Sequence, residues 1–296
     1  MAQEIENVGW RCLWPAGCTL GEGPIWDART GVVRFVDIEQ ATLHRFDPTT
    51  GDHASWSAPC RVGSIAVRVG GGLVAGTEHG FALIDPEASS FRIIDQPESH
   101  LPDNRFNDGK VDPHGIFWAG TMDDRKQARS GTLYALHPDH RWDAIDLGYR
   151  ITNGPTFSLG GDVLYHSDTL DRTTFAFDLG TGGTVRGKRV FRRWDDVTGN
   201  PDGMTTDAEG NLWIAFWGGW CVRRVSPTGE VLGEYPLPVS NVTSVAFGGP
   251  AFDRLIVTSA RAELDAAALD RQPLAGGLFE ITGHGTRGLD GGVWAG

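Results

Sequence analysis

The sequence predicts an all-β fold, a six-bladed β-propeller with four-stranded blades. Short segments alternate between polar and apolar residues and are bounded by Gly, Pro, Asn and Asp, which is typical of antiparallel strands. Similar segments recur at roughly 40 to 50 residues, the period of one propeller blade. They begin near Gly23, Gly63, Asn107, Asn153, Pro201 and Thr243.

Each repeat has the same order of elements. An apolar strand such as "VVRFVD" (32–37) precedes an alternating strand such as "TLYALH" (132–137), and an Asp-Pro, Ser-Pro or Gly-rich turn follows. Six repeats fill the 296 residues, so we expect a single domain over residues 1–296. Closing the strands into a ring leaves few free sheet edges. A two-sheet β-sandwich is the alternative, but it would not need a sixfold repeat.

The ring also has to be closed between its first and last repeats. We expect "VGWRCLW" (8–14) to add a strand to the last blade, beside "GGLFEITG" (276–283). Long helical periodicity is missing except in "RAELDAAALDRQ" (261–272), where the pattern predicts a loop or a short helix.

Composition excludes several classes of partner. The chain has 26 Lys and Arg against 38 Asp and Glu, a formal charge of −12. Such a surface repels phosphate backbones and anionic lipids, so we expect no nucleic-acid or membrane partner. The first residues, "MAQEIEN", carry acids where a signal peptide needs positive charge. We therefore expect a cytoplasmic monomer.

The cysteines do not form a recognisable pattern. Cys12, Cys18, Cys60 and Cys221 show no CxxC spacing, so neither a disulfide framework nor a zinc site is predicted from them. We expect all four to be reduced and structural.

The segments that begin the repeats differ in their polar residues. They read "LGEGPIW" with Glu22, "RFNDGK" with Arg105, Asn107 and Asp108, "ITNGPTF" with Asn153 and "NPDGMTT" with Asp202. Asx-Gly pairs are ordinary turn signals, but glutamate has no comparable turn chemistry. Aligned in register, these side chains would converge on the central axis, where carboxylate and amide oxygens suit a hard divalent cation.

These motifs resemble the gluconolactonase, regucalcin and senescence-marker-protein family. The resemblance rests on "LGEGPIW", "RFNDGKVDPHGIFWAGTM", "ITNGPTFS" and "PDGMTTDAEGNLWIAFWGG", and it extends over nearly the whole chain. Each motif alone is weak, but the combination is specific, and it is most similar to bacterial sugar (aldono) lactonases. It implies a six-bladed propeller that hydrolyses a pentono- or hexonolactone to the aldonic acid with one divalent ion, Ca²⁺, Zn²⁺, Mg²⁺, Mn²⁺ or Fe²⁺.

The resemblance also implies roles, position by position. Glu22, Asn153 and Asp202 match the family's metal ligands, and Arg105 and Asn107 match its substrate-contacting pair. Asp202 is our candidate general base, because it could take a proton from water at the metal.

Other polar residues carry no such match. The lid segment "DDRKQARSG" (123–131) departs from the family pattern, and we expect Arg125 and Lys126 to face solvent. Lys110 and Asp112 are expected in a turn and on the solvated face.

Two alternatives remain open at this stage. One is a non-enzymatic propeller that binds metal or docks a protein, and the other is a metal-dependent esterase or phosphotriesterase. The polar pair Arg105 and Asn107 favours a polyol substrate, and the missing GxSxG motif argues against an α/β-hydrolase. His166, Ser167 and Asp168 are consecutive on a predicted strand, so they cannot converge as a triad.

Overall fold

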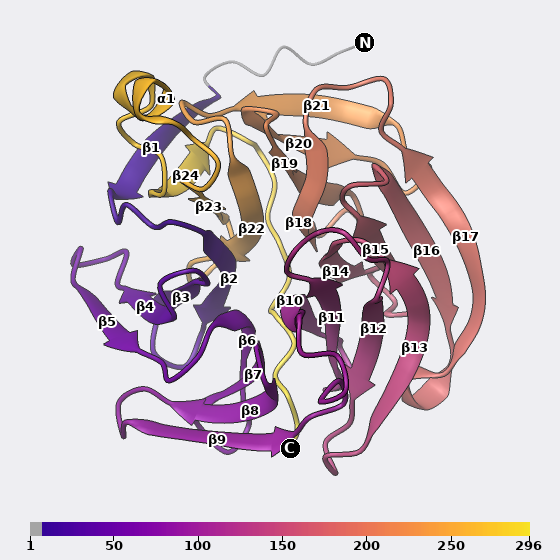
Figure 1. Ribbon diagram of the computed structural model, residues 1–296. Coiled ribbons are helices and arrows are strands. Elements are labelled where there is room, and N and C mark those ends of the chain that lie inside the picture. The colour runs from indigo at the N-terminus through magenta and orange to yellow at the C-terminus, as the bar shows by residue number, and fades with distance from the viewer. Residues whose placement is uncertain (1–7) are drawn as a thin grey trace.

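Six antiparallel sheets of four strands each surround a central axis, as Figure 1 shows. The computed structural model describes residues 8–296. The acidic segment 1–7, on which the signal-peptide expectation rests, lies outside them. The all-β, six-bladed prediction is confirmed. None of the helices in the described range is long and apolar enough to cross a membrane.

The first three blades follow one another along the chain, each running from the axis outward. Blade 1 contains β2 (Gly21–Asp27), β3 (Val32–Asp37), β4 (Thr42–Phe46) and β5 (His53–Ser57). Blade 2 contains β6 (Val62–Val67), β7 (Leu73–Thr77), β8 (Gly80–Asp85) and β9 (Ser90–Asp95). Blade 3 contains β10 (Asn104–Val111), β11 (Phe117–Asp123), β12 (Gly131–Leu136) and β13 (Trp142–Tyr149).

The remaining blades repeat this order. Blade 4 contains β14 (Thr152–Phe157), β15 (Val163–Asp168), β16 (Thr173–Leu179) and β17 (Val185–Arg193), with the 3₁₀ turn Thr181–Gly183 before β17. Blade 5 contains β18 (Asn200–Thr206), β19 (Leu212–Trp217), β20 (Cys221–Val225) and β21 (Val231–Pro236). Blade 6 contains β22 (Val242–Gly248), β23 (Arg254–Ser259) and β24 (Leu278–Thr282).

The fourth strand of blade 6 comes from the other end of the chain. β1 (Gly9–Trp14) pairs antiparallel with β24, from Gly9 opposite Thr282 to Trp14 opposite Leu278. Since the first and last parts of the chain share one sheet, the ring is closed by backbone hydrogen bonds. The helix α1 (Ala266–Arg271) lies in the β23–β24 connection and is capped by Asp265, which accepts from the Ala268 N–H.

Every innermost strand carries a register shift near its start. In β2 the shift lies between Glu22 and Ile25, and in β18 between Pro201 and Met204. Such bulges re-aim side chains and are common beside active sites. Glycine is required here: Gly154 has a positive φ of 50°, and a Cβ on Gly203 would lie 2.1 Å from the Ser244 Oγ. The Asx-Gly pairs are therefore turn elements and also direct their polar side chains toward the axis.

The C-terminal segment crosses the ring (Figure 1), at the end of the channel opposite the polar motifs. Gly288 bridges to Asp207, and the fully buried Trp294 bridges to Arg68. Residues 289–293 line a cavity with the C-terminal ends of β2, β6 and β22, whereas the polar motifs lie at the N-terminal ends of the inner strands. The channel is therefore covered at one end by the chain's own tail.

The expectation for Lys110 and Asp112 is wrong in part: Lys110 lies in β10, and Asp112 lies at a turn but does not face solvent. Asp112 is buried and accepts from the backbone N–H groups of His114 and Ile116 and from the indole N–H of Trp118. The Lys110 ammonium donates to the Met204 carbonyl oxygen in blade 5. The turn assignment of Asp112 holds, but its carboxylate fixes that turn against the core instead of facing water.

His166 on β15 is a buried polar side chain with an unusual environment. It is fully buried, its ring meets that of Tyr149 edge-on at 4.8 Å, and neither ring nitrogen has a hydrogen-bond partner among residues 8–296. Burial lowers the pKa of His166 to about 3. Between about pH 3 and pH 6.5, the imidazole is therefore neutral in the folded protein but protonated in the unfolded chain.

We predict that this difference makes the protein sensitive to acid. As pH falls from about 6.5 toward 3, the unfolded chain takes up a proton that the native state does not, so the contribution of His166 to stability falls by roughly 2.5 kcal/mol between pH 7 and 4.5. His166→Leu should flatten this part of the profile. Urea unfolding at pH 7 and 4.5 measures it, with the exposed His100→Leu as control. An unchanged pH profile in His166→Leu would contradict the assignment.

Candidate active site at the mouth of the channel

The N-terminal ends of the inner strands border a cavity of about 410 Å³. Its size suits a small organic ligand. The walls combine charged, amide and apolar side chains from several blades. They include Leu20, Glu22, Glu39, Arg61, Arg105, Asn107, Met122, Asp124, Lys126, Ile151, Asn153, Thr169, Leu170, Asn200, Asp202, Trp217, Ala262 and Glu263. All five side chains to which the sequence analysis assigned a role therefore line one cavity.

Buried carboxylates from two blades form the floor of this cavity, and a third lies beneath it. Glu22 lies on β2 and Asp202 on β18, and the charge of Glu22 acts on the ionisation of Asp202. Burial and the Asp108 charge raise the pKa of Glu22 to about 8. Burial and the Glu22 charge raise the pKa of Asp202 well above its ordinary value. The cluster therefore resists carrying its full negative charge without a cation.

Asp108, on β10, has a different surrounding from the other two. Its Oδ1 accepts from the Gly109 N–H and its Oδ2 from the Gly154 N–H, both at 2.7 Å. Burial raises the pKa of Asp108, and the Lys110 charge opposes that shift. With both oxygens held by backbone donors, Asp108 connects blades 3 and 4 beneath the cavity floor.

The amide side chains Asn107 and Asn153 are hydrogen-bonded to each other. The Asn107 Nδ2 donates to the Asn153 Oδ1 at 3.0 Å and to the Thr152 carbonyl oxygen at 2.8 Å. The Asn153 Nδ2 donates to the Thr169 Oγ1 at 2.7 Å. The Asn153 Oδ1 is thereby directed by hydrogen bonds on both sides of its amide. Asn107 uses both amide hydrogens within the protein.

Arg105 is buried in the wall, with only 5% of its surface exposed. Its Nε donates to Asp124 Oδ1 at 2.9 Å, and its Nη1 donates to Asn107 Oδ1 at 2.7 Å and to the Phe106 carbonyl oxygen at 3.1 Å. Burial lowers the pKa of Arg105, and the Asp124 charge opposes that shift. The Arg105 Nη2 has no hydrogen-bond partner within the described chain, so it remains available to a ligand.

The floor of the cavity fits a divalent cation. The Asp202 Oδ1 is buried and has no hydrogen-bond donor among the residues the structure describes. An unpaired buried carboxylate oxygen is costly unless a positive charge lies beside it. Glu22 and Asp202 supply two carboxylates, and the Asn153 amide oxygen supplies a neutral donor. This oxygen set suits Ca²⁺, Mg²⁺ or Mn²⁺.

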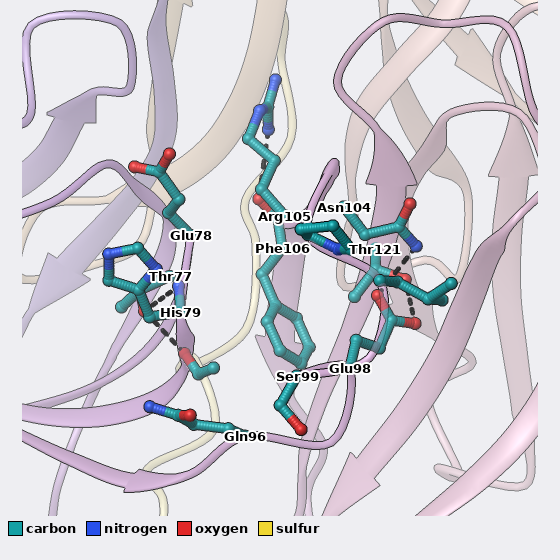
Figure 2. A pocket seen from close by; sticks show the side chains of 13 residues that line it. Thr77, Glu78, His79, Gln96, Glu98, Ser99, Asn104, Arg105, Phe106 and Thr121 are labelled. Atoms are coloured by element: carbon teal, nitrogen blue, oxygen red, sulfur yellow. Dashed lines mark hydrogen bonds between the residues drawn. The ribbon is translucent and has the colours of Figure 1, made fainter.

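A second cavity, of about 290 Å³, lies on the other side of Arg105 (Figure 2). Its carboxylate Glu98 already accepts from the Asn104 Nδ2, the Thr121 hydroxyl and the Tyr134 hydroxyl. Because these three donors satisfy Glu98, it resembles a structural anchor. The unpaired carboxylate oxygen belongs to the first cavity, which we take as the functional site.

The cysteines are all free thiols. Cys18, Asp37 and His44 place possible ligand atoms within 4.8 Å of one another, a grouping that their sequence spacing did not indicate. Asp37, however, accepts from the backbone N–H groups of Thr19, Leu20 and Gln40. Asp168 accepts from three backbone N–H groups at the matching point of blade 4. We therefore assign Asp37 to capping the blade.

The consecutive residues His166, Ser167 and Asp168 do not form a triad. Ser167 Oγ is bonded to Thr174 Oγ1 at 2.8 Å, and His166 has no partner in the described part of the chain. This agrees with the expectation from strand geometry.

The lid segment makes more contacts with the rest of the protein than the sequence predicted. Lys126 lines the cavity and its Nζ lies 2.6 Å from Glu263 Oε1 on the opposite rim, so the solvent-facing expectation is only partly right. Arg125 is exposed, as expected, and pairs with Asp103 at 2.7 Å.

Sequence reasoning missed Arg61 and left Asp124 without a role. Arg61 immediately precedes β6, the inner strand of blade 2, and Gly21 and Glu22 begin β2, the inner strand of blade 1. Aligning the second repeat in register with the first could therefore have identified Arg61. The contact with Asp124 could not be found this way, because it depends on the path of an aperiodic loop.

Comparisons with known proteins show which family and which solved structures this chain resembles. The family described as "SMP-30/Gluconolactonase/LRE-like region" matches residues 20–261. Regucalcin of Xenopus laevis is 37% identical over 297 residues, covering 96% of this chain and 98% of the relative. A regucalcin structure from Agrobacterium tumefaciens, described as a calcium-binding protein, has a TM-score of 0.92 and 29% identity, covering 97% of each chain. A luciferin-regenerating enzyme has a TM-score of 0.91 and 31% identity, covering 98% of this chain and all of the other.

We predict that the carboxylate cluster lowers the stability of the metal-free protein and that a divalent ion restores it. Asp202→Asn and Glu22→Gln each replace a carboxyl group that the fold holds at a raised pKa with a neutral amide, so without metal each should melt roughly 2–6 °C above the parent. Both should lose the stabilisation of about 2.7 kcal/mol expected at a hundredfold excess of metal over Kd.

Thermal unfolding after chelation, with Ca²⁺, Mn²⁺ or Zn²⁺ added back, measures both effects. Glu98→Gln, in the second cavity, is the control that should keep the metal response. A full metal response in both cluster variants would show that the ion binds elsewhere.

Proposed function

Because the chain belongs to the SMP-30/gluconolactonase/LRE-like family, we propose that it hydrolyses a sugar aldonolactone, a pentono- or hexonolactone, to the aldonic acid. The reaction would use one divalent cation held by Glu22, Asn153 and Asp202. The expected partner is the small-molecule lactone alone, and the protein would act as a cytoplasmic monomer.

The observation that carries the proposal is the unpaired Asp202 oxygen on the floor of a polar cavity. A lactone is a cyclic ester, and its hydrolysis needs a polarised carbonyl, an activated water and support for the developing oxyanion. A divalent ion bound at the floor would polarise the carbonyl and lower the pKa of a bound water. A buried carboxylate with a free oxygen is a suitable proton acceptor beside it.

The chain's own residues then take separate roles. Asp202 would accept a proton from water as the water oxygen bonds to the lactone carbonyl carbon. The ring C–O bond then breaks, and its oxygen takes the proton that Asp202 accepted and becomes the hydroxyl of the acid. Arg105, through its free Nη2, would hold a hydroxyl or the oxyanion of the substrate.

Asn107 has a narrower role than a free amide would have. Its two amide hydrogens are used by Thr152 and Asn153, so only an Oδ1 lone pair remains for a substrate hydroxyl. We propose that it both contacts the sugar and directs the Asn153 oxygen.

A panel of aldonolactones tested with different metals examines the proposal. Arg105→Ala should lower kcat/KM roughly ten- to a hundredfold without weakening metal binding, since a guanidinium is not a cation ligand. Asp202→Asn should lower it further, on the order of a thousandfold, because base and ligand charge are lost together.

Acid release at constant pH, corrected for spontaneous opening, measures turnover. Near-parental turnover in Asp202→Asn would refute the mechanism. A parent inactive on every sugar lactone would refute the activity; metal binding without any hydrolysis would then favour a binding propeller, and hydrolysis of aryl esters or phosphotriesters an esterase.

A further inference from the structure

We propose that Arg61 is a positioning residue, which acts through Asp124 to fix the Arg105 guanidinium for the substrate. This inference rests on the proposed function only in its kinetic consequences. Its structural basis is a hydrogen-bonded connection between blade 2, the lid and blade 3.

Two arginines share one carboxylate in the cavity wall. The Arg61 Nη1 donates to both oxygens of Asp124, at 3.1 and 3.0 Å, while the Arg105 Nε donates to Asp124 Oδ1 at 2.9 Å. The Asp124 side chain keeps about a third of its surface exposed, whereas that of Arg105 keeps 5%. Without Arg61, the partly exposed Asp124 carboxylate would be held by Arg105 alone.

Arg61 is itself hydrogen-bonded to a second carboxylate, that of Glu78. Its Nη2 donates to Glu78 Oε1 at 3.0 Å, and its backbone N–H donates to Glu78 Oε2 at 3.3 Å. Glu78 lies on the wall of the second cavity, as Figure 2 shows. Glu39 lies farther away, at 3.8 Å from Arg61 Nη1. A planar guanidinium whose two terminal nitrogens bond different carboxylates is a rigid connection that lysine cannot reproduce.

The same arrangement indicates what Arg61 does not do. Two carboxylates hold its terminal nitrogens, and a third lies nearby, so Arg61 offers no unpaired charge to an anionic substrate. This favours an uncharged polyhydroxy lactone, with Arg105 as the arginine that contacts it. Without Arg61, the Arg105 Nε would lose a fixed acceptor, and the guanidinium that presents the free Nη2 would be fixed only through Nη1, by Asn107 and the Phe106 carbonyl oxygen.

A double-mutant cycle tests the connection. Arg61→Met should lower kcat/KM about tenfold, mainly through KM, with metal affinity unchanged. In an Arg105→Met background the same change should have almost no further effect, because both changes act through one guanidinium. Arg61→Lys should recover only part of the activity. Arg125→Met, which removes a neighbouring exposed arginine paired with Asp103, is the matched control.

A second readout does not need turnover. The Arg105 Nε–H, buried and bonded to Asp124, should give a slowly exchanging NMR resonance that disappears in Arg105→Lys. Arg61→Met, or Arg61→Lys if the former does not fold, should accelerate its exchange at least tenfold; Arg125→Met should not.

The two arms separate the possible failures. Additive losses in the cycle would mean that Arg61 contacts the substrate directly, and an unchanged Nε–H exchange would mean that it does not hold Arg105; either result overturns the inference. If the parent hydrolyses no lactone, the proposed function fails and the exchange measurement alone decides the role of Arg61.

Discussion

Like charges buried at one end of the channel are the constraint on which the site depends. Glu22, Asp108 and Asp202 approach one another where water cannot screen them, and burial raises the pKa of each. The fold offsets part of this repulsion with backbone N–H donors to Asp108 and with the ammonium of Lys110, whose own pKa burial lowers to about 8. It supplies no donor from the described residues to Asp202 Oδ1. Buried carboxylates that lack enough donors favour the binding of a cation.

The propeller brings these groups together by repeating one backbone irregularity. All six inner strands shift register near their starts, so each blade directs one position toward the axis. Blades 2 and 6 place Val62 and Val242 at that shift, while blades 1 and 5 place Glu22 and Asp202 there or beside it. Identical geometry with different side chains separates the structural role of the repeat from its chemistry.

This separation explains what the sequence could predict. The period predicted six blades, and alignment in register predicted that Glu22, Asn153 and Asp202 would line one cavity, because register is a property of the repeat. Lys110 and Asp112 were misjudged because their partners, a carbonyl oxygen in another blade and a core indole, depend on three-dimensional packing that periodicity does not encode. The contact of Asp124 with two arginines was inaccessible for the same reason.

Hydrogen bonds then join the repeats into one unit. From Arg61 in blade 2 they pass through Asp124 and Arg105 to Asn107, and on to Asn153 in blade 4. The chain of bonds continues through a threonine hydroxyl to a backbone carbonyl oxygen of blade 5. The part of this chain of bonds nearest the carboxylate floor is set by the repeat, whereas Asp124 lies on an aperiodic lid. If the floor holds a cation and the wall a sugar, as proposed, changes in the lid would alter how the sugar is held while the carboxylate floor stays intact.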